Sequence, residues 1–277
     1  MNAGFSPDIV GRRIGLLTAW ASRSGGGVFE AVVAQAALLR TLGAEPVVVA
    51  LRDRHSAEDA ARLAGCDLHH AEVLGPRLIG FAPKLGKLLD AAELDLLHLH
   101  RIWMYPSHAA AAWSRRSGKP SLVSPHGMLD PWITRRGRWK KTLARHGYEH
   151  RAWRRAAAFH ALTVQEAADI GHETARWDSL IVPNAAPPAS LAPWAERPPT
   201  ILYLSRIHPK KNIAALVDAW SRLHAAGQCR PDVRLVIAGW GDAPDMAALG
   251  HILQAAPPSV EFVGPQFGAD KARLLSD

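Results

Sequence analysis

The sequence is poor in cysteine and has no long apolar run. Its 277 residues include two cysteines, Cys66 and Cys229, which lie far apart and form no CxxC pair. Neither a disulfide framework nor a zinc site is therefore indicated, and a reducing cytoplasm is the expected compartment. No apolar run reaches the ~18 residues that a membrane-spanning helix needs, so membrane contact would have to be peripheral. The first residues, MNAGFSPDIVGRR, lack the apolar stretch of a secretory signal.

Charged residues make up 21% of the chain and hydrophobic residues 48%, which is typical of a globular protein. The basic residues are concentrated in one place. The segment Arg135–Arg155 carries nine of the 33 Lys and Arg residues and one acid, Glu149, so its formal charge of +8 equals that of the whole chain. We expect this basic segment to attract a polyanion or an anionic surface.

Aromatic residues alternate with the cations of the basic segment, at Trp139, Tyr148 and Trp153. This combination suits an interfacial helix on anionic lipid. The cations expected to face the membrane are Arg135, Arg136, Arg138, Lys140 and Lys141. The same combination suits nucleic acid, but no helix-turn-helix, zinc-finger or RNA-binding sheet motif accompanies it, so we expect no nucleic-acid partner.

Short apolar runs alternate with longer helical patterns, which predicts an α/β protein with parallel sheets. In the first part of the chain, strands are expected at Ile14–Thr18, Pro46–Ala50, Leu94–His98, Ser121–Ser124, Ala158–Leu162 and Leu180–Val182. The clearest helices there are Val28–Leu42 and Ser107–Ser117. The pattern restarts with strands Ile201–Ser205, Val233–Ala238 and Val260–Val263, and with helices Ile213–Ala225, Asp245–Gln254 and one that begins at Ala269.

Six prolines between residues 183 and 200 predict a linker, because proline at this density blocks both helices and central strands. We therefore expect an N-terminal Rossmann-like domain over residues 1–183, a linker over 184–200 and a C-terminal domain over 201–277. The last helix has no glycine stop and no closing strand after it, so we expect a truncated chain with an incomplete second domain.

A glycine-rich turn, Gly25 to Gly27, follows the first strand and leads into a helix. Backbone N–H groups at a helix N-terminus can approach a phosphate closely where no Cβ intervenes. Glu30 stands where a dinucleotide fingerprint needs its third glycine, which disfavours a nicotinamide oxidoreductase. Plain strand-to-helix geometry explains such a turn about as well as a ligand site does.

Arg206 and Lys211 follow the strand at 201–205, at the strand end where open α/β sheets bind ligands. Cations beside a helix start suit a diphosphate, although a solvated basic loop is the simpler explanation. His126 follows the strand Ser121–Ser124 and could hydrogen-bond a sugar hydroxyl, transfer a proton or be uncommitted.

His98 and His100 alternate and therefore share one face of a strand or its end. No third ligand lies at a metal-site spacing from them, so we expect no metal.

Together these segments resemble retaining glycosyltransferase family 4, the large group-1 family with the two-domain GT-B fold. The resemblance spans nearly the whole chain, in the family's order, through SGGGVFEAVV, LLHLHRIWMYPS, SPHGMLDPW, RAAAFHALTVQEAADI, IVPNA, YLSRIHPKKNIAALVDAW, LVIAGWGD and VEFVGPQFGADKARLLSD.

The resemblance implies transfer of a sugar, with retention, from a nucleotide-diphosphate donor to a glycan acceptor, expected to be lipid-linked, in bacterial polysaccharide biosynthesis. It implies no cofactor and no metal, and a place at the cytoplasmic face of the membrane. His126 would contact the transferred sugar, while Arg206 and Lys211 would neutralise the leaving diphosphate. The implied donor-binding residues are Gly26, Gly27, Asn184, Gly239, Gly241, Val263 and Gly264.

The chain departs from the family pattern in two places. Asn212 stands where the family usually has glycine after the lysine, and the segment with two glutamates eight positions apart would begin beyond Asp277. The alternatives are therefore a catalytically inactive truncated fragment and a basic nucleic-acid-binding protein.

Overall fold

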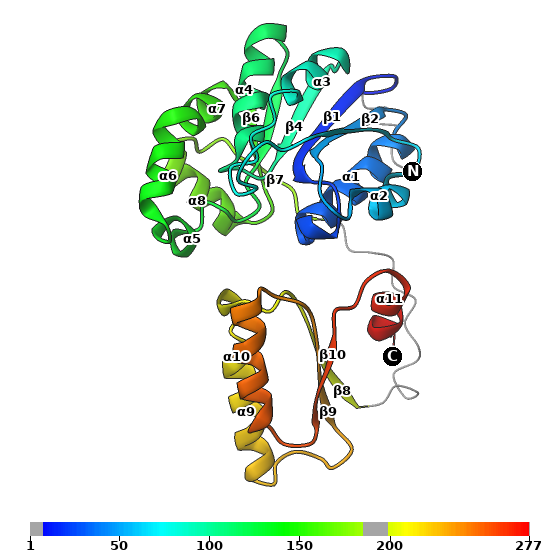
Figure 1. Cartoon of the computed structure of the whole chain (residues 1–277), viewed down its shortest axis with the longest axis vertical. Coiled ribbons are helices and arrows are strands. Elements are labelled where there is room, and N and C mark those ends of the chain that lie inside the picture. Colours follow the sequence, from blue (N-terminus) through cyan, green and yellow to red (C-terminus); the bar gives the residue numbers. More distant parts are fainter. Residues whose placement is uncertain (1–7, 185–198, 277) are drawn as a thin grey trace, which may run out of the picture. The chain divides into compact units, whose positions relative to one another are not determined.

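The computed structural model describes residues 8–184 and 199–276, and the chain divides into two compact units, Met1–Ala185 and Ala186–Asp277 (Figure 1). Each unit is an α/β structure built on a parallel sheet, which confirms the expected fold class. Of the linker expected over 184–200, the structure describes residues 184, 199 and 200, and the rest lies outside the described residues.

The first unit contains a seven-stranded sheet in the order β3-β2-β1-β4-β5-β6-β7. Its strands are β1 Arg13–Trp20, β2 Glu45–Leu51, β3 Asp67–Ala71, β4 Leu96–His100, β5 Ser121–Ser124, β6 Ala158–Ala161 and β7 Leu180–Ile181. The chain order reverses between β1 and β4, and open α/β sheets bind ligands at the carboxyl edge beside such a reversal.

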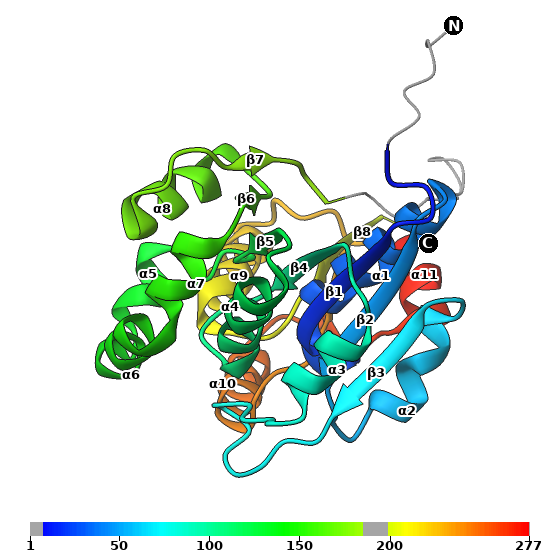
Figure 2. The ribbon, with the colours of Figure 1, turned by 90° about the horizontal axis from the view of Figure 1, so that it is seen from above.

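Helices cover both faces of this sheet. They are α1 Gly27–Thr41, α2 Ser56–Asp59, α3 Leu85–Ala91, α4 Tyr105–Ser117, α5 Pro131–Arg135, α6 Arg138–Ala144, α7 His150–Arg155 and α8 Val164–Thr174. One apolar core joins the sheet to α1 through Phe29 and Val32. The other apolar core joins the opposite face to α3, α4, α7 and α8. Figures 1 and 2 show α1 and α4 on opposite faces of the sheet.

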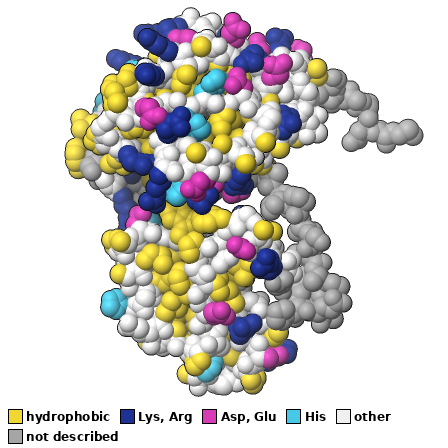
Figure 3. Space-filling model, turned by 45° about the vertical axis from the view of Figure 1, so that its right-hand side comes forward, with side chains coloured by type: hydrophobic (Ala, Val, Ile, Leu, Met, Phe, Trp, Pro, Cys, Tyr) yellow, Lys and Arg dark blue, Asp and Glu magenta, His cyan; other side chains and the backbone are white. Residues whose placement is uncertain are grey.

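The second unit has a three-stranded sheet in the order β10-β9-β8. Its elements are β8 Thr200–Leu204, α9 Ile213–Ala225, β9 Arg234–Ala238, α10 Ala243–Gln254, β10 Val260–Gly264 and α11 Gly268–Ser276. The buried Trp220 and Leu249 join α9 and α10 to one face of the sheet. Leu202 and Leu204 belong to the other face, where Figure 3 shows a gathering of hydrophobic side chains.

The basic segment does not form one continuous α-helix. Helix α5 ends before Arg136, whose backbone is extended, and α6 begins after Gly137 at φ 61°. Helix α6 then continues through a π-helical turn, Arg145–Glu149, into α7.

Candidate functional site

The glycine turn after β1 leaves open space in front of the N-terminus of α1. Gly26 is the N-cap of this helix at φ 56°, a left-handed conformation that favours glycine. A Cβ on Gly26 or Gly27 would meet no atom within 4 Å, whereas one on Gly25 would lie 2.5 Å from the carbonyl oxygen of Trp20. Packing therefore requires Gly25, while Gly26 and Gly27 leave room for a ligand at the positive end of α1.

Two buried carboxylates hold this turn, and sequence reasoning missed both. Ser22 Oγ donates to Asp53 Oδ2 at 2.6 Å, and the Arg23 guanidinium donates to both oxygens of Asp59 at 2.6 to 3.1 Å. The hydrogen bonds from Arg23 lower the pKa of Asp59, although burial opposes them. Asp53 follows β2 at the same carboxyl edge, and this position was the signal that could have identified it.

A band of polar side chains crosses the carboxyl half of the first sheet, on the face that α1 covers. It consists of Thr18 on β1, His98 and His100 on β4, Ser124 on β5 and His160 on β6. His98 and His100 are 2% and 1% exposed, and their ring centroids lie 4.2 Å apart. The alternation of His98 and His100 onto one face is thus confirmed, while the register between strands adds the other members.

Hydrogen bonds connect α1 to the end of β7 through this histidine band. His160 Nε2 lies 2.8 Å from Val182 O, which can only accept, so the tautomer with its proton on Nε2 donates there and accepts at Nδ1 from Ser124 Oγ at 2.7 Å. Ser124 Oγ then accepts from His98 Nε2 at 2.7 Å, and His98 Nδ1 accepts from the Gln35 amide at 2.9 Å. Burial lowers the pKa of His98 to about 3, so the His98 ring stays uncharged at neutral pH.

His126 lies beside the histidine band on the loop after β5. Its Nε2 is 3.0 Å from His100 Nδ1, and the two rings stack with centroids 5.2 Å apart. Its backbone is left-handed at φ 53°, a conformation that costs energy in a residue other than glycine. Burial lowers the pKa of His126 to about 4, with nearby His160 and Arg101 adding to the effect. A neutral imidazole fits the hydrogen-bonding role better than acid catalysis.

Glu166 holds the loop that carries His126. Its Oε1 accepts from Gly127 N at 2.7 Å and its Oε2 from Leu162 N at 2.8 Å, so one carboxylate joins the ends of β5 and β6. Thr163 caps α8 by accepting from Glu166 N at 3.0 Å. The T-x-x-E spacing is typical of a capping box and was the available sequence signal for this residue.

Glu149, the one acid of the basic segment, is fully buried and holds the loop after β4. Its Oε1 accepts from Trp103 N at 2.5 Å, and Trp103 is itself left-handed at φ 72°. Trp103 Nε1 donates to Met128 O at 3.2 Å, which ties this loop to the loop after β5. Burial raises the pKa of Glu149 to about 7, although the hydrogen bond from Trp103 opposes it.

In the second unit, the glycines after β9 support the loop after β8. A Cβ on Gly239 would lie 1.9 Å from Ser205 O, and one on Gly241 would lie 2.5 Å from Ile207 O. Both glycines therefore allow the two loops to pack closely. Because Arg206 lies between Ser205 and Ile207, this packing positions Arg206.

Arg206 and Lys211 are exposed on the turn between β8 and α9. Neither side chain makes a hydrogen bond or an ion pair within residues 8–184 and 199–276, so both cations are available to a ligand. Asn212, which caps α9, adopts φ 49° and ψ 42°. Asparagine tolerates this left-handed conformation better than most residues other than glycine, which agrees with its place where the family resemblance implied glycine.

The remaining predicted donor-binding residues lie at the end of β10 and after β7. Gly264 ends β10 at φ 74°, and its carbonyl oxygen accepts from Gly239 N at 2.9 Å. Val263 is half-buried in the same strand, and Asn184 is exposed at the end of the first described range.

The structure gives Lys141 a role different from membrane contact. Its ammonium donates to Ile133 O and Arg136 O, so it satisfies carbonyl groups at the end of α5, and burial lowers its pKa. Arg135 and Arg136 are exposed. The side chains of Arg138 and Lys140 lie outside what the structure describes.

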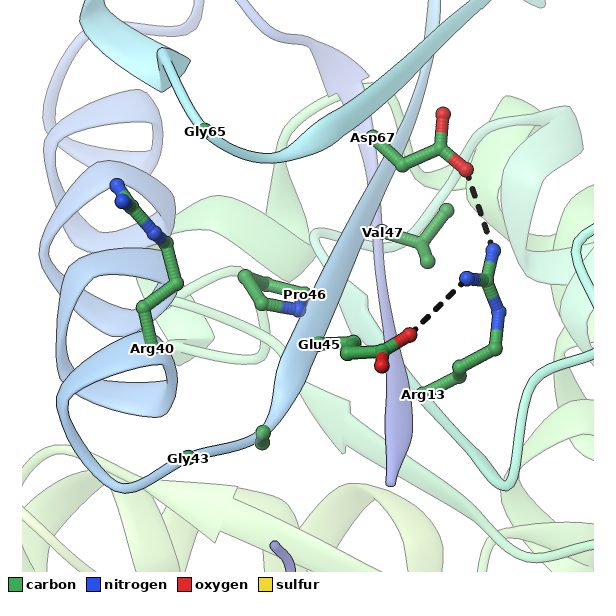
Figure 4. Close-up of a pocket in the computed structure, with 9 residues that line it drawn as sticks. Arg13, Arg40, Gly43, Glu45, Pro46, Val47, Gly65 and Asp67 are labelled. Carbon is green, nitrogen blue, oxygen red and sulfur yellow. Dashed lines mark hydrogen bonds and ion pairs between the residues drawn. The ribbon is translucent and has the colours of Figure 1, made fainter. Parts of the chain in front are cut away.

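A separate pocket lies at the amino edge of the first sheet (Figure 4). Arg13 projects into it and pairs with Glu45 and Asp67 at 3.2 Å each, while Arg40 donates to Ala64 O at 2.9 Å. Because these cations already have partners, the pocket does not have the character of an anion site.

No group of three or more His, Cys, Asp or Glu residues in the described ranges is arranged to hold a metal ion. Likewise, no helix in the described part of the chain has both the length and the apolar character needed to cross a membrane.

The comparisons with known proteins agree with this geometry. The family model of the glycosyl transferase 4-like domain matches residues 26–185, more than half of the chain. The chain therefore belongs to the glycosyl transferase 4-like domain family, which identifies it as a transferase. The match begins at Gly26 and includes the histidines and Ser124 of the band, Glu149 and Glu166. A search of curated protein sequences gave no match.

Solved structures confirm the GT-B fold. HepE from Anabaena in complex with UDP and glucose has a TM-score of 0.70 at 17% identity, over 95% of this chain and 71% of that chain. The lipopolysaccharide outer core galactosyltransferase WaaB has a TM-score of 0.55 at 15% identity, over 92% and 68%. A putative UDP-N-acetylglucosamine 2-epimerase from Listeria monocytogenes has a TM-score of 0.60 at 14% identity, over 94% and 71%. These similarities show the fold alone, so the transferase class rests on the family match.

We expect Glu149→Gln to remove a pH dependence of stability. The folded state keeps this carboxyl protonated up to a pKa of about 7, whereas the unfolded chain titrates it near 4.5. The folded state thus binds more protons between these values, and the free energy of unfolding falls as pH rises from about 4.5 to 7. Glutamine keeps an acceptor for Trp103 N–H without the charge, so above pH 7 the variant should be more stable by up to about 3 kcal/mol.

Urea unfolding at pH 5 and pH 8 measures this effect. The exposed Glu93→Gln is the matched control, and its pH dependence should equal that of the wild type. An unchanged pH dependence in Glu149→Gln would show that the buried carboxyl is not the source.

Gly239→Ala should destabilise the second unit, because its Cβ would meet backbone 1.9 Å away. We expect a loss of about 1–3 kcal/mol in the free energy of unfolding. Gly250→Ala on α10 is the control, since its Cβ meets nothing within 4 Å and alanine favours a helix by about 0.5–1 kcal/mol. Thermal unfolding of both variants compares them, and equal melting temperatures would contradict the proposed contact between the two loops.

Proposed function

We propose that this protein transfers a sugar from a nucleotide-diphosphate donor to a glycan acceptor, with retention at the anomeric carbon. The observation that carries the proposal is the family match over residues 26–185, which includes the open glycines Gly26 and Gly27 and His126. Retention follows from the resemblance of the motif set, and NMR of the anomeric proton of the product tests it.

The chemistry requires charge stabilisation at the leaving group. Breaking the bond between the anomeric carbon and the phosphate oxygen leaves negative charge on the diphosphate, which fixed cations stabilise. We assign this role to Arg206 and Lys211, whose side chains are exposed and unpaired within the described residues. Gly26 and Gly27 would offer N–H groups to the donor phosphates, and neutral His126 would hydrogen-bond the sugar.

The structural neighbours support a narrower donor and acceptor class. HepE was solved with UDP and glucose, and WaaB is named as a lipopolysaccharide galactosyltransferase. We therefore propose a UDP-sugar as the donor and a bacterial polysaccharide or its lipid-linked precursor as the acceptor.

Arg206→Ala and Lys211→Ala should each weaken UDP binding about tenfold or more, because each removes a charge-assisted contact to phosphate. Isothermal titration with UDP and with uridine measures the effect, and uridine affinity should not change because it lacks the phosphates. Arg222→Ala is the control, as this arginine is 79% exposed and pairs with Asp218 on α9. Unchanged UDP affinity in both variants would remove these cations from the donor site.

We also propose that α5 and α6 contact an anionic membrane. The exposed aromatic and aliphatic side chains Trp132, Trp139 and Leu143 lie on these helices, with Trp139 67% exposed. The Arg136 guanidinium lies 4.0 Å from the centroid of the Trp132 ring. Aromatic side chains among cations are what an interfacial site on anionic lipid requires.

Arg135→Glu combined with Arg136→Glu should weaken binding to vesicles that contain anionic phospholipid by about tenfold or more, given about 1 kcal/mol per cation near such a surface. Vesicle flotation with and without anionic lipid measures this, and Arg222→Glu with Arg273→Glu is the control pair. Undiminished flotation would contradict the membrane role. Tight, salt-dependent DNA binding that the same substitutions abolish would favour the nucleic-acid alternative.

A further inference from the structure

His126 and His100 form a hydrogen bond whose direction the structure restricts. His126 Nε2 and His100 Nδ1 lie 3.0 Å apart. Burial is the main cause that lowers the pKa of both imidazoles, that of His126 to about 4 and that of His100 well below its ordinary value. Two neutral rings need one donor and one acceptor, so either His100 donates from Nδ1 or His126 donates from Nε2.

The second nitrogen of His100 distinguishes these two arrangements. His100 Nε2 is buried and has no hydrogen-bond partner among the described residues. If His126 donated, His100 would carry its proton on Nε2 as a buried N–H group without an acceptor. Among backbone groups, orphaned buried N–H groups are rarer than under-satisfied acceptors. The same ordering, applied to the imidazole, favours the arrangement that places the proton of His100 on Nδ1 and leaves a bare lone pair at Nε2.

The histidine band restricts the His100 ring as well. His100 lies between His98, at a centroid distance of 4.2 Å, and His126, at 5.2 Å. Hydrogen bonds to Gln35 and Ser124 fix the His98 ring in turn. The orientation of His100 is therefore set by neighbours on α1, β4 and β5.

We propose that His100 is a positioning residue that donates from Nδ1 to His126 Nε2 and thereby makes His126 an Nδ1–H donor toward the sugar. The contact with the sugar rests on the proposed function. The tautomer does not, because it follows from the burial and hydrogen bonding of the two histidines. In this state His126 offers a donor to a sugar oxygen, and its only basic nitrogen is occupied by His100.

Long-range ¹H–¹⁵N correlation spectra of protein labelled at histidine test the tautomer directly. The His126 signals are identified by their loss in His126→Gln. We expect a protonated Nδ1 and a bare Nε2 in the wild type. A His126 protonated at Nε2 in the wild type would overturn the proposal.

Two substitutions of His100 test its role. The amide N–H of His100→Asn can replace the Nδ1 donor, so the His126 tautomer should persist. His100→Leu removes the donor, so His126 should shift toward the Nε2–H form, with circular dichroism confirming that both variants are folded. An unchanged His126 tautomer in folded His100→Leu would overturn the positioning role.

Turnover of the UDP-sugar separates this inference from the proposed function. We expect kcat to fall about tenfold or more in His100→Leu, because a hydrogen bond that stabilises the transition state is weakened. In His100→Asn, kcat should largely recover. If the tautomers behave as expected while His126→Ala retains full turnover, the contact with the sugar is wrong and the tautomer assignment stands.

Discussion

The carboxyl half of the first sheet depends on a chain of hydrogen bonds from Val182 O to the Gln35 amide, which one set of histidine tautomers satisfies. Four strands place histidine, serine and threonine side chains on a buried face, where an unpaired polar group is costly. Val182 O can only accept, so the donor direction of each link back to Gln35 follows from that carbonyl group. The same burial keeps His98 and His126 uncharged at neutral pH, so this edge of the sheet offers hydrogen bonds rather than positive charge. In the proposed reaction, positive charge is supplied by Arg206 and Lys211 in the second unit.

The sequence predicted most of the architecture because strands buried on both faces are nearly continuous apolar runs. The expected strands at 14–18, 46–50 and 121–124 fall within or on β1, β2 and β5. Strand β3 was missed because Asp67, His69 and His70 make this edge strand too polar to form an apolar run. Strand β4 lies two residues later than expected. The basic segment suited an interfacial helix, but its break at Gly137 and its π-helical turn were not predicted.

The candidate site was less predictable, because its members are brought together by contacts between strands. His98 and His100 were recognisable as neighbours, but their links to His160 and Gln35 depend on strand register and helix packing. Glu149 and Glu166 lie in helical segments, and their carboxylates accept hydrogen bonds from backbone N–H groups that are distant in the sequence. Composition alone does not reveal such contacts. For Gly239 and Gly241, the structure supplies a physical reason that motif reading did not, namely the close approach of two loops.

The bridge made by Glu166 limits how this protein can be recombined with its relatives. One carboxylate receives N–H groups from the loop after β5 and from the end of β6, so these segments behave as a single interchangeable unit. A chimera that exchanges residues 125–130 without 162–166 would separate the carboxylate from the loop geometry that it evolved with. Domain grafting should therefore transplant both segments together with the first turn of α8.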